Sequence, residues 1–400
     1  NPQLVDSLQL DRPAMATYAR GVELATRMTI ERATGCARWH ALVERLSQAG
    51  VHRSWRRAAL LSLTRSEAAD ALLQRASSEL LANRAALLRE LIRTVMAVDV
   101  LPASKVFEAA GIDPALIPAS VNIPHGPAWT TLIIWLLRVG DGIPKEAIPE
   151  IVQLYTVFSI GTFGTSYLTP FTTRQIYRWL RLAEPLDSVS MRSGGLKSDL
   201  REAFVMFAQT TPELAAEYLT AVAKSEHNED IVRSLLTMRG TLAKAAPAEL
   251  AKLTAQALIA RPRQRERRFS REHEEAFTYL DHAFLQASPA QGPFLDLLTN
   301  SPKDGLALVH RLVAHAVAHR NRGAVWGTKG IDLALSGGTR TFPWTQTYFW
   351  SRNSTSYAVT SALMALEAWA HRRIEAGEAL DGVLVDVLGP KGSCAAYLLV

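Results

Sequence analysis

Three histidines stand near the end of one helical segment, and their spacing raises the question of a metal site. His315 and His319 lie four residues apart in HAVAH, which places them about 40° apart on one flank of a helix. His310 lies about 140° from His315, so the three imidazoles cannot converge on one ion. A catalytic zinc takes three protein ligands, and no HExxH motif adds a general base here. The spacing therefore favours histidines that cover apolar surface, and no metal ligand is predicted.

Two loops with glycine and lysine come close to a phosphate-binding motif without completing it. GGLKS (194–198) and GAVWGTKG (323–330) both lack the glycine directly before lysine that GxxxxGK[ST] requires. Neither follows a predicted strand, so the backbone cradle for a phosphate is not expected. No GxSxG elbow of a serine hydrolase is present either. The sequence therefore predicts no catalytic residue and no cofactor-binding residue in this chain.

The densest charge in the sequence is an arginine run between two helical segments. Arginine binds phosphate through its bidentate guanidinium group, and the ring of Phe269 within the run offers a surface on which a base can stack. Glu266, Glu272, Glu274 and Glu275 dilute this charge, so a solvated linker remains the alternative to nucleic-acid contact. The candidate polyanion contacts are Arg261, Arg263, Arg265, Arg267, Arg268 and Arg271.

Aromatic residues crowd the segment between Phe342 and Trp350. Such a density typically packs a loop onto the core. Aromatic residues also form hot spots of protein interfaces, so partner binding remains the second interpretation. The candidate residues of a partner surface are Trp326, Trp344, Tyr348 and Trp350.

These residues have to be positioned by helices, because helical signals dominate the chain. GPAWTTLIIWLLRVG begins with Pro127 and ends at Gly140, which is the usual asymmetry of a helix. After this helix, Pro144 and Pro149 mark the start of the next helical segment, IPKEAIPEIVQLYTVF. From Thr211, three helices with very short turns are predicted in TPELAAEYLTAVAKSE, NEDIVRSLLTMRGTLAKA and APAELAKLTAQALIA. GVLVDVLG (382–389) is the one candidate strand, and a helix fits it equally well.

The histidines themselves belong to a predicted helical hairpin over residues 288–320. Pro293 opens its first helix, Ser301 caps the second, and Pro302 takes the first position of that second helix. The inward-facing residues are Leu306, Val309, Val313 and Ala316, which follow helical spacing. Another helix is predicted to start from Ser354 as its N-cap, with Val359, Leu363, Leu366, Ala370 and Ile374 at helical spacing.

Together these elements predict an all-α fold. Helix pairs joined by short loops are typical of an irregular HEAT-like α-solenoid of antiparallel helix pairs. A few long loops interrupt it at 161–173, 185–195 and 321–346, and the last is long enough to be functional. We expect four regions: an N-terminal helical array (1–115), helical hairpins with a Gly/Thr-rich loop (116–190), helical repeats (191–320), and an aromatic-rich insertion with C-terminal helices (321–400).

Composition sets the remaining limits. The chain has 400 residues, 48% of them hydrophobic, and a formal net charge of +6, so it is long enough for more than one core. Cys36 and Cys394 form no CxxC pair, which favours a reducing compartment without a disulfide framework. No apolar stretch approaches the roughly 20 residues of a membrane span. We expect a cytoplasmic protein without membrane contact, and a segment of a larger polypeptide, because it starts on Asn1 and ends in an apolar helical run.

Three stretches carry a resemblance to a known family: QGPFLDLLTNSPKDGLALVHRLVAHA, SALMALEAWAHRRIEAGEALDGVLVDVLGPKGSCAAYLLV and GPAWTTLIIWLLRVGDGIPKEAIPEIVQLY. Their helical texture resembles the repeat region of large bacterial ATPases of the STAND group, of the AVAST antiphage-defence kind. That resemblance implies a sensor region coupled to a nucleotide switch. The ATP and Mg²⁺ of such a protein would be bound at a Walker motif, which this segment does not contain, so no catalytic residue is carried over.

The function expected from the sequence is therefore that of a non-catalytic scaffold or sensor segment of a larger bacterial protein. It would bind a protein partner, other domains of the same chain or a ligand, and the resemblance implies a role in antiviral defence. The alternative is a nucleic-acid-binding or DNA-acting HEAT-like protein that uses a basic face.

Overall fold

A computed structural model describes a large part of the chain and divides it into two compact units, Asn1–Leu180 and Arg181–Val400. The described residues are 8–13, 15, 45, 55, 85–96, 100–102, 122–124, 127–162, 164–183, 195–225, 229–259, 276–321, 330–335, 338–343, 347–354, 356–389 and 394–400. In these ranges no helix combines the length and the apolar composition needed to cross a membrane.

The first unit is built on helices that follow the proline and glycine signals of the sequence. Among its described residues, the longer helices are α6 (Ala85–Met96), α8 (Pro127–Val139), α9 (Ile148–Gly161) and the part of α10 (Thr169–Ala183) up to Leu180. Gly140 ends α8 with a φ of +53°, a backbone conformation that favours glycine. The short helices η2 (Gly140–Gly142) and η3 (Lys145–Ala147) lead into α9, and strands β1 (Val100–Pro102) and β2 (Asn122–Pro124) pair antiparallel.

The loop predicted over 161–173 is shorter than expected, because α10 already begins at Thr169. Pro170 occupies its second position, where a helix has no need of the missing N–H. The hydroxyls of Thr172 and Thr173 both donate to the carbonyl of Thr169, at 3.0 and 2.8 Å. Threonines that look like loop residues in the sequence thus bond inside the first turn of a helix.

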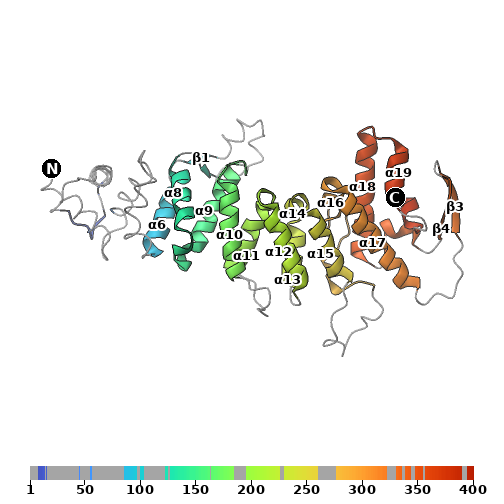
Figure 1. The fold of residues 1–400 in the computed structure, drawn as a ribbon, viewed down its shortest axis with the longest axis horizontal. Coiled ribbons are helices and arrows are strands. Elements are labelled where there is room, and N and C mark those ends of the chain that lie inside the picture. Colours follow the sequence, from blue (N-terminus) through green and yellow to red (C-terminus); the bar gives the residue numbers. More distant parts are fainter. Residues whose placement is uncertain are drawn as a thin grey trace, which may run out of the picture. The chain divides into compact units, whose positions relative to one another are not determined.

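The second unit contains most of the described helices (Figure 1). In chain order they are α11 (Leu196–Met206), η4 (Ala208–Thr210), α12 (Pro212–Lys224), α13 (Glu229–Thr237), α14 (Arg239–Ala245), α15 (Pro247–Ile259), η6 (Tyr279–Phe284), α16 (Phe294–Asn300), α17 (Pro302–Asn321), η7 (Tyr348–Ser351), α18 (Tyr357–Glu375), α19 (Leu380–Leu388) and α20 (Ala396–Leu399). Helix α15 packs on α12 and α17, α16 packs on α17 and α18, and α18 packs on α17 and α19. The described part of the chain is thus mostly helical, as predicted.

The segment NEDIVRSLLTMRGTLAKA forms two helices rather than the single helix predicted. The break falls at Met238, whose ψ of 31° departs from helical geometry. Beyond it, Arg239 forms a salt bridge with Asp296 of α16 at 3.4 Å and donates to the carbonyl of Ala290. The first residue of α14 therefore bonds to residues about 50 positions further along the chain. Helical periodicity in the sequence does not indicate such long-range contacts.

A β-hairpin occupies part of the insertion that was predicted as an irregular loop over 321–346. Strands β3 (Gly330–Leu335) and β4 (Gly338–Pro343) pair antiparallel, with Leu335 opposite Gly338. Exposed and half-buried residues alternate along β3. The sequence did contain this signal, as IDLAL alternates and SGG follows it, which is typical of a hairpin.

The predicted hairpin of residues 288–320 is confirmed, with one shift of its packed face. Helix α16 ends at Asn300 and α17 starts at Pro302, with the Ser301 hydroxyl donating to Asp304 at 2.6 Å. The buried face of α17 consists of Gly305, Leu308, Val309, Leu312, Val313 and Ala316, whereas Leu306 is only half-buried. Gly305 takes the place predicted for Leu306 because the backbone of Leu298 passes too close for a side chain.

Candidate functional site

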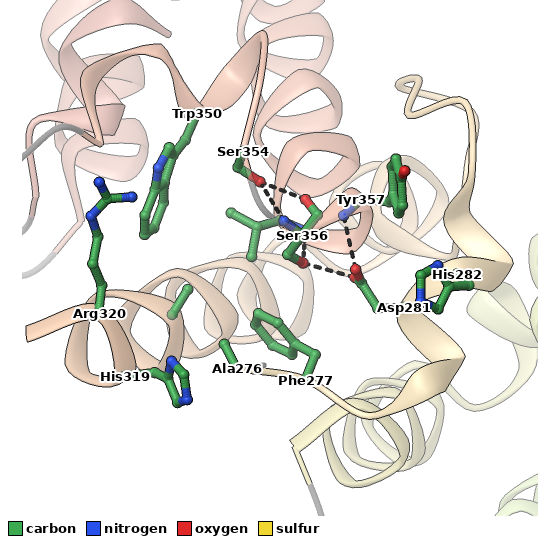
Figure 2. A pocket seen from close by; sticks show the side chains of 12 residues that line it. Ala276, Phe277, Asp281, His282, His319, Arg320, Trp350, Ser354, Ser356 and Tyr357 are labelled. Carbon is green, nitrogen blue, oxygen red and sulfur yellow. Dashed lines mark hydrogen bonds between the residues drawn. The ribbon is translucent and has the colours of Figure 1, made fainter. Parts of the chain in front are cut away.

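A cavity of about 350 Å³ lies in the second unit where η6, α17, η7 and the start of α18 meet. A volume of this size lies near the lower end of small-molecule sites. The cavity is lined by Ala276, Phe277, Asp281, His282, Ala316, His319, Arg320, Trp350, Ser354, Ser356, Tyr357 and Val359 (Figure 2). These residues come from parts of the sequence up to about eighty positions apart, so only the folded unit brings them together.

Asp281 is the only acid among these lining residues, and it caps helix α18 from another element. Its Oδ1 accepts from the hydroxyl of Ser356 at 2.7 Å and from the backbone N–H of Ala358 at 2.8 Å. Its Oδ2 accepts from the N–H of Tyr357 at 3.0 Å. The first N–H groups of a helix have no partner within the helix, and the helix dipole favours an anion there. Asp281 thus holds the start of α18 with both of its carboxyl oxygens.

The two serines that line the cavity, Ser354 and Ser356, also form hydrogen bonds at the start of α18. Ser356 is the N-cap of α18, and its Oγ accepts from the N–H of Val359 at 3.2 Å. Ser354, the predicted N-cap, lies outside the helix and instead donates to the carbonyl of Ser356 while accepting from the N–H of that residue. The predicted cap was therefore displaced by two residues. Both hydroxyls stabilise the turn that leads into α18, and the carboxylate to which Ser356 donates, Asp281, also accepts from the first N–H groups of that helix.

The rest of the wall is aromatic and basic. Phe277 and Trp350 are almost fully buried, and Tyr357 packs near His282 with ring centroids 6.1 Å apart. Figure 2 shows Arg320 and Trp350 at one end of the cavity and Asp281 with His282 at the other. The formally charged side chains of the lining are one acid, Asp281, and one base, Arg320. The lining thus combines aromatic rings with polar groups of both charges.

The two histidines of HAVAH, His315 and His319, make different contacts. The Nε2 of His315 donates to the carbonyl of Ala276 at 2.7 Å, and its ring packs edge-on against Phe277. His315 does not line the cavity but contacts two residues that do, Ala276 and Phe277. His319 lines the cavity itself. Within the described ranges, no group of three or more His, Cys, Asp and Glu residues is arranged to hold a metal ion.

His310 lies on another side of α17 and joins the end of the chain to this helix. Its Nδ1 lies 2.9 Å from the hydroxyl of Tyr397, and its Nε2 lies 3.1 Å from the carbonyl of Asp386. Because a carbonyl only accepts, Nε2 carries the proton and Nδ1 accepts from Tyr397. Burial lowers the pKa of His310 below its usual value, against a smaller opposing effect of Asp386. Gly389 makes room for this ring, because a Cβ there would collide with it.

The predicted interaction residues are only partly placed by the structure. The arginine run, Arg261 to Arg271, lies outside the described residues, as do Trp326 and Trp344. Trp350 is 4% exposed and Tyr348 is half-buried, as the core-packing interpretation of this segment expects. Phe349 between them is 62% exposed.

Sequence reasoning did not find most of the cavity residues. Asp281, His282 and Arg320 belong to no motif, and the partners of Asp281 lie about 75 residues away along the chain. The one usable signal was the pair of serines before an apolar helical run, which marks a helix start.

No family model matches this chain. A search of the curated proteins also finds no match. The function of the chain has to be inferred from the residues of the cavity.

Proposed function

We propose that this chain is a non-catalytic helical scaffold that binds a ligand in the cavity beside Asp281. The proposal includes the finer architecture expected from the sequence, an irregular HEAT-like α-solenoid of antiparallel helix pairs. The packing of the consecutive helices α16 and α17, and of α15 on α12 and α17, supports it, because each helix pair in such an array packs on neighbouring pairs.

The observation that carries the proposal is the engagement of Asp281. A general acid or base has to exchange a proton with a substrate within hydrogen-bond reach. Both oxygens of Asp281 instead accept bonds from Ser356 and from the first N–H groups of α18. The carboxylate that a hydrolytic site would use thus stabilises a helix start, and the other groups that line the cavity are suited to binding.

The wider setting is the one that the sequence resemblance implies. We propose a sensor segment of a larger bacterial protein of antiviral defence, in which ligand binding is passed on to neighbouring domains or to a protein partner. On this proposal, any nucleotide chemistry of the parent protein, with its ATP and Mg²⁺, takes place outside these residues.

The proposal can be tested by thermal shift combined with turnover assays. We expect at least one class of small ligand to raise the unfolding temperature, because a molecule that binds only the native state stabilises it. Nucleotides, metal ions and damaged or single-stranded DNA should show no turnover with the purified chain. Turnover that disappears in a folded Asp281→Asn variant would overturn the proposal, since that variant removes the buried acid of the cavity.

A further inference from the structure

We propose that the outer edge of strand β3 binds β3 of a second copy of this chain, so that two β3–β4 hairpins join into one antiparallel sheet of four strands. A hairpin of two strands is marginally stable by itself in water, and further strands stabilise it. The residues that line the cavity all lie outside this hairpin.

The short turn of the hairpin determines which backbone groups point outward. Only two residues separate Leu335 from Gly338, so this pair exchanges both of its backbone hydrogen bonds. Bonded and non-bonded pairs alternate along an antiparallel ladder, so the pairs that contain Ala334 and Asp332 are of the second kind. The N–H and C=O groups of these two residues therefore point away from β4. In the described part of the chain, no third strand accepts or donates to them.

The two edges of the hairpin differ in how well they can pair with another strand. Pro343 stands at an outward position of β4, because it pairs with Gly330, and it has no N–H to donate. Strand β4 also holds the hairpin in the unit, since Phe342 is fully buried and Arg340 donates to two carbonyls at the end of α19. Strand β3 contains no proline and no basic residue, which are common means of protecting an edge. The open edge is therefore that of β3.

The side chains of β3 match those of a second, antiparallel β3. When the two-fold axis passes beside Leu333, Asp332 of one copy lies opposite Ala334 of the other, and both residues have the outward backbone groups that this pairing needs. On the other face of the sheet Leu333 meets Leu333, and Ile331 meets Leu335. These apolar side chains are only half-buried within one chain. No two acids stand directly opposite each other, which would be unfavourable.

Sedimentation equilibrium of the intact chain over about a hundredfold range of concentration measures the association. We expect a reversible equilibrium between monomer and dimer. Ala334→Pro removes an outward N–H from each copy without removing a bond inside the hairpin, and it should weaken the dimer by about tenfold or more. The matched control is Thr339→Pro, which removes the outward N–H directly across the hairpin, on β4. This variant should associate as the parent chain does.

Two charge changes at one position test the register. Ala334→Lys places a cation opposite Asp332 of the second copy and should tighten the dimer by about fivefold, whereas Ala334→Glu places an anion there and should weaken it by about the same factor. A general charge effect has the opposite sign, because the formal net charge of the chain is already +6. Ala334 lies on the exposed face of β3, so circular dichroism should show an unchanged fold in both variants.

Several results would overturn the proposal. A chain that stays monomeric over the whole range of concentration does so, whichever other strand binds the edge. An equal loss of association in Ala334→Pro and Thr339→Pro would show that the dimer does not distinguish the edge of β3 from that of β4. If the two charge changes at Ala334 shifted the equilibrium in the same direction, or in the order that net charge predicts, Asp332 would not lie opposite Ala334 in the dimer.

Discussion

His310 shows what a single titratable side chain can contribute to this fold. It joins α17 to the carbonyl of Asp386 and to the hydroxyl of Tyr397, which is 3% exposed. Protonation of His310 would put a second N–H on the ring and take away the acceptor of the Tyr397 hydroxyl. The native state therefore resists protonation, which agrees with the lowered pKa of this residue.

We predict that His310 makes the protein less stable in mild acid. Below the ordinary histidine pKa of about 6.5 the unfolded chain binds a proton that the native state does not, so stability is lost as the pH falls towards the lower native pKa. The difference in unfolding free energy between the parent chain and His310→Gln should shrink between about pH 8 and about pH 5. Urea unfolding followed by circular dichroism measures it. A difference that stays constant or grows would contradict the prediction.

For single residues, the sequence shows the side-chain type but seldom the residue to which that side chain bonds. The helical spacing of His315 and His319 was correct, and it excluded convergence of three histidines on one ion. Asp281, in contrast, has no periodic or motif signal, because its role depends on a helix start about 75 residues later. Long-range hydrogen bonds of this kind follow from the tertiary fold and not from local pattern.

At the scale of elements, the α16–α17 pair depends on one position without a side chain. A Cβ at Gly305 would lie 2.6 Å from the backbone nitrogen of Leu298 and 2.8 Å from its Cα. Backbone atoms cannot move aside as a flexible side chain can. The close approach of the two helices therefore requires glycine here, although glycine is otherwise unfavourable inside a helix.

We predict opposite effects for two glycine-to-alanine changes in helices. Gly305→Ala should lower the free energy of unfolding by about 1–3 kcal/mol, because overpacking outweighs the better helix propensity of alanine. Gly382→Ala in α19 should raise it by about 0.5–1 kcal/mol, because the nearest atom to the added methyl, Oε1 of Glu378, is 3.8 Å away. Urea titration of both variants measures the difference. Equal effects would show that α16 and α17 do not pack this closely.

Helix ends with proline or glycine were predictable, and ends set by tertiary contacts were not. Pro127, Gly140 and Pro302 mark helix boundaries in both the sequence and the structure. The break at Met238 and the cap at Ser356 depend on Arg239 and Asp281, which bond to residues far along the chain. The β3–β4 hairpin was missed for another reason, because its short alternation stood inside a segment already interpreted as a loop.

At the scale of the whole molecule, the excess of positive charge leaves the nucleic-acid alternative open to a direct test. The formal net charge is +6, and the arginine run contributes strongly to it. A protein that binds nucleic acid through such a run loses affinity steeply as salt rises, because bound counterions are released.

We predict that replacing Arg265, Arg267 and Arg268 by glutamate leaves the thermal stabilisation of the chain by a cavity ligand unchanged. Any binding of single-stranded DNA or RNA should fall sharply in this variant and with added salt. Fluorescence anisotropy with a labelled oligonucleotide at two salt concentrations measures the second effect. Nucleic-acid binding that is insensitive to both changes would exclude a role for the arginine run.

The capping of α18 by Asp281 also has a consequence for the order of folding. Helices α16 and α17 are joined by Ser301 alone, so their contact closes a very short loop. The contact between Asp281 and Ser356 closes a loop of 75 residues, which costs more chain entropy and forms more slowly. During synthesis the carboxylate leaves the ribosome well before the helix that it caps. The cavity is therefore completed only when α18 docks, and a ligand can bind only after this late step.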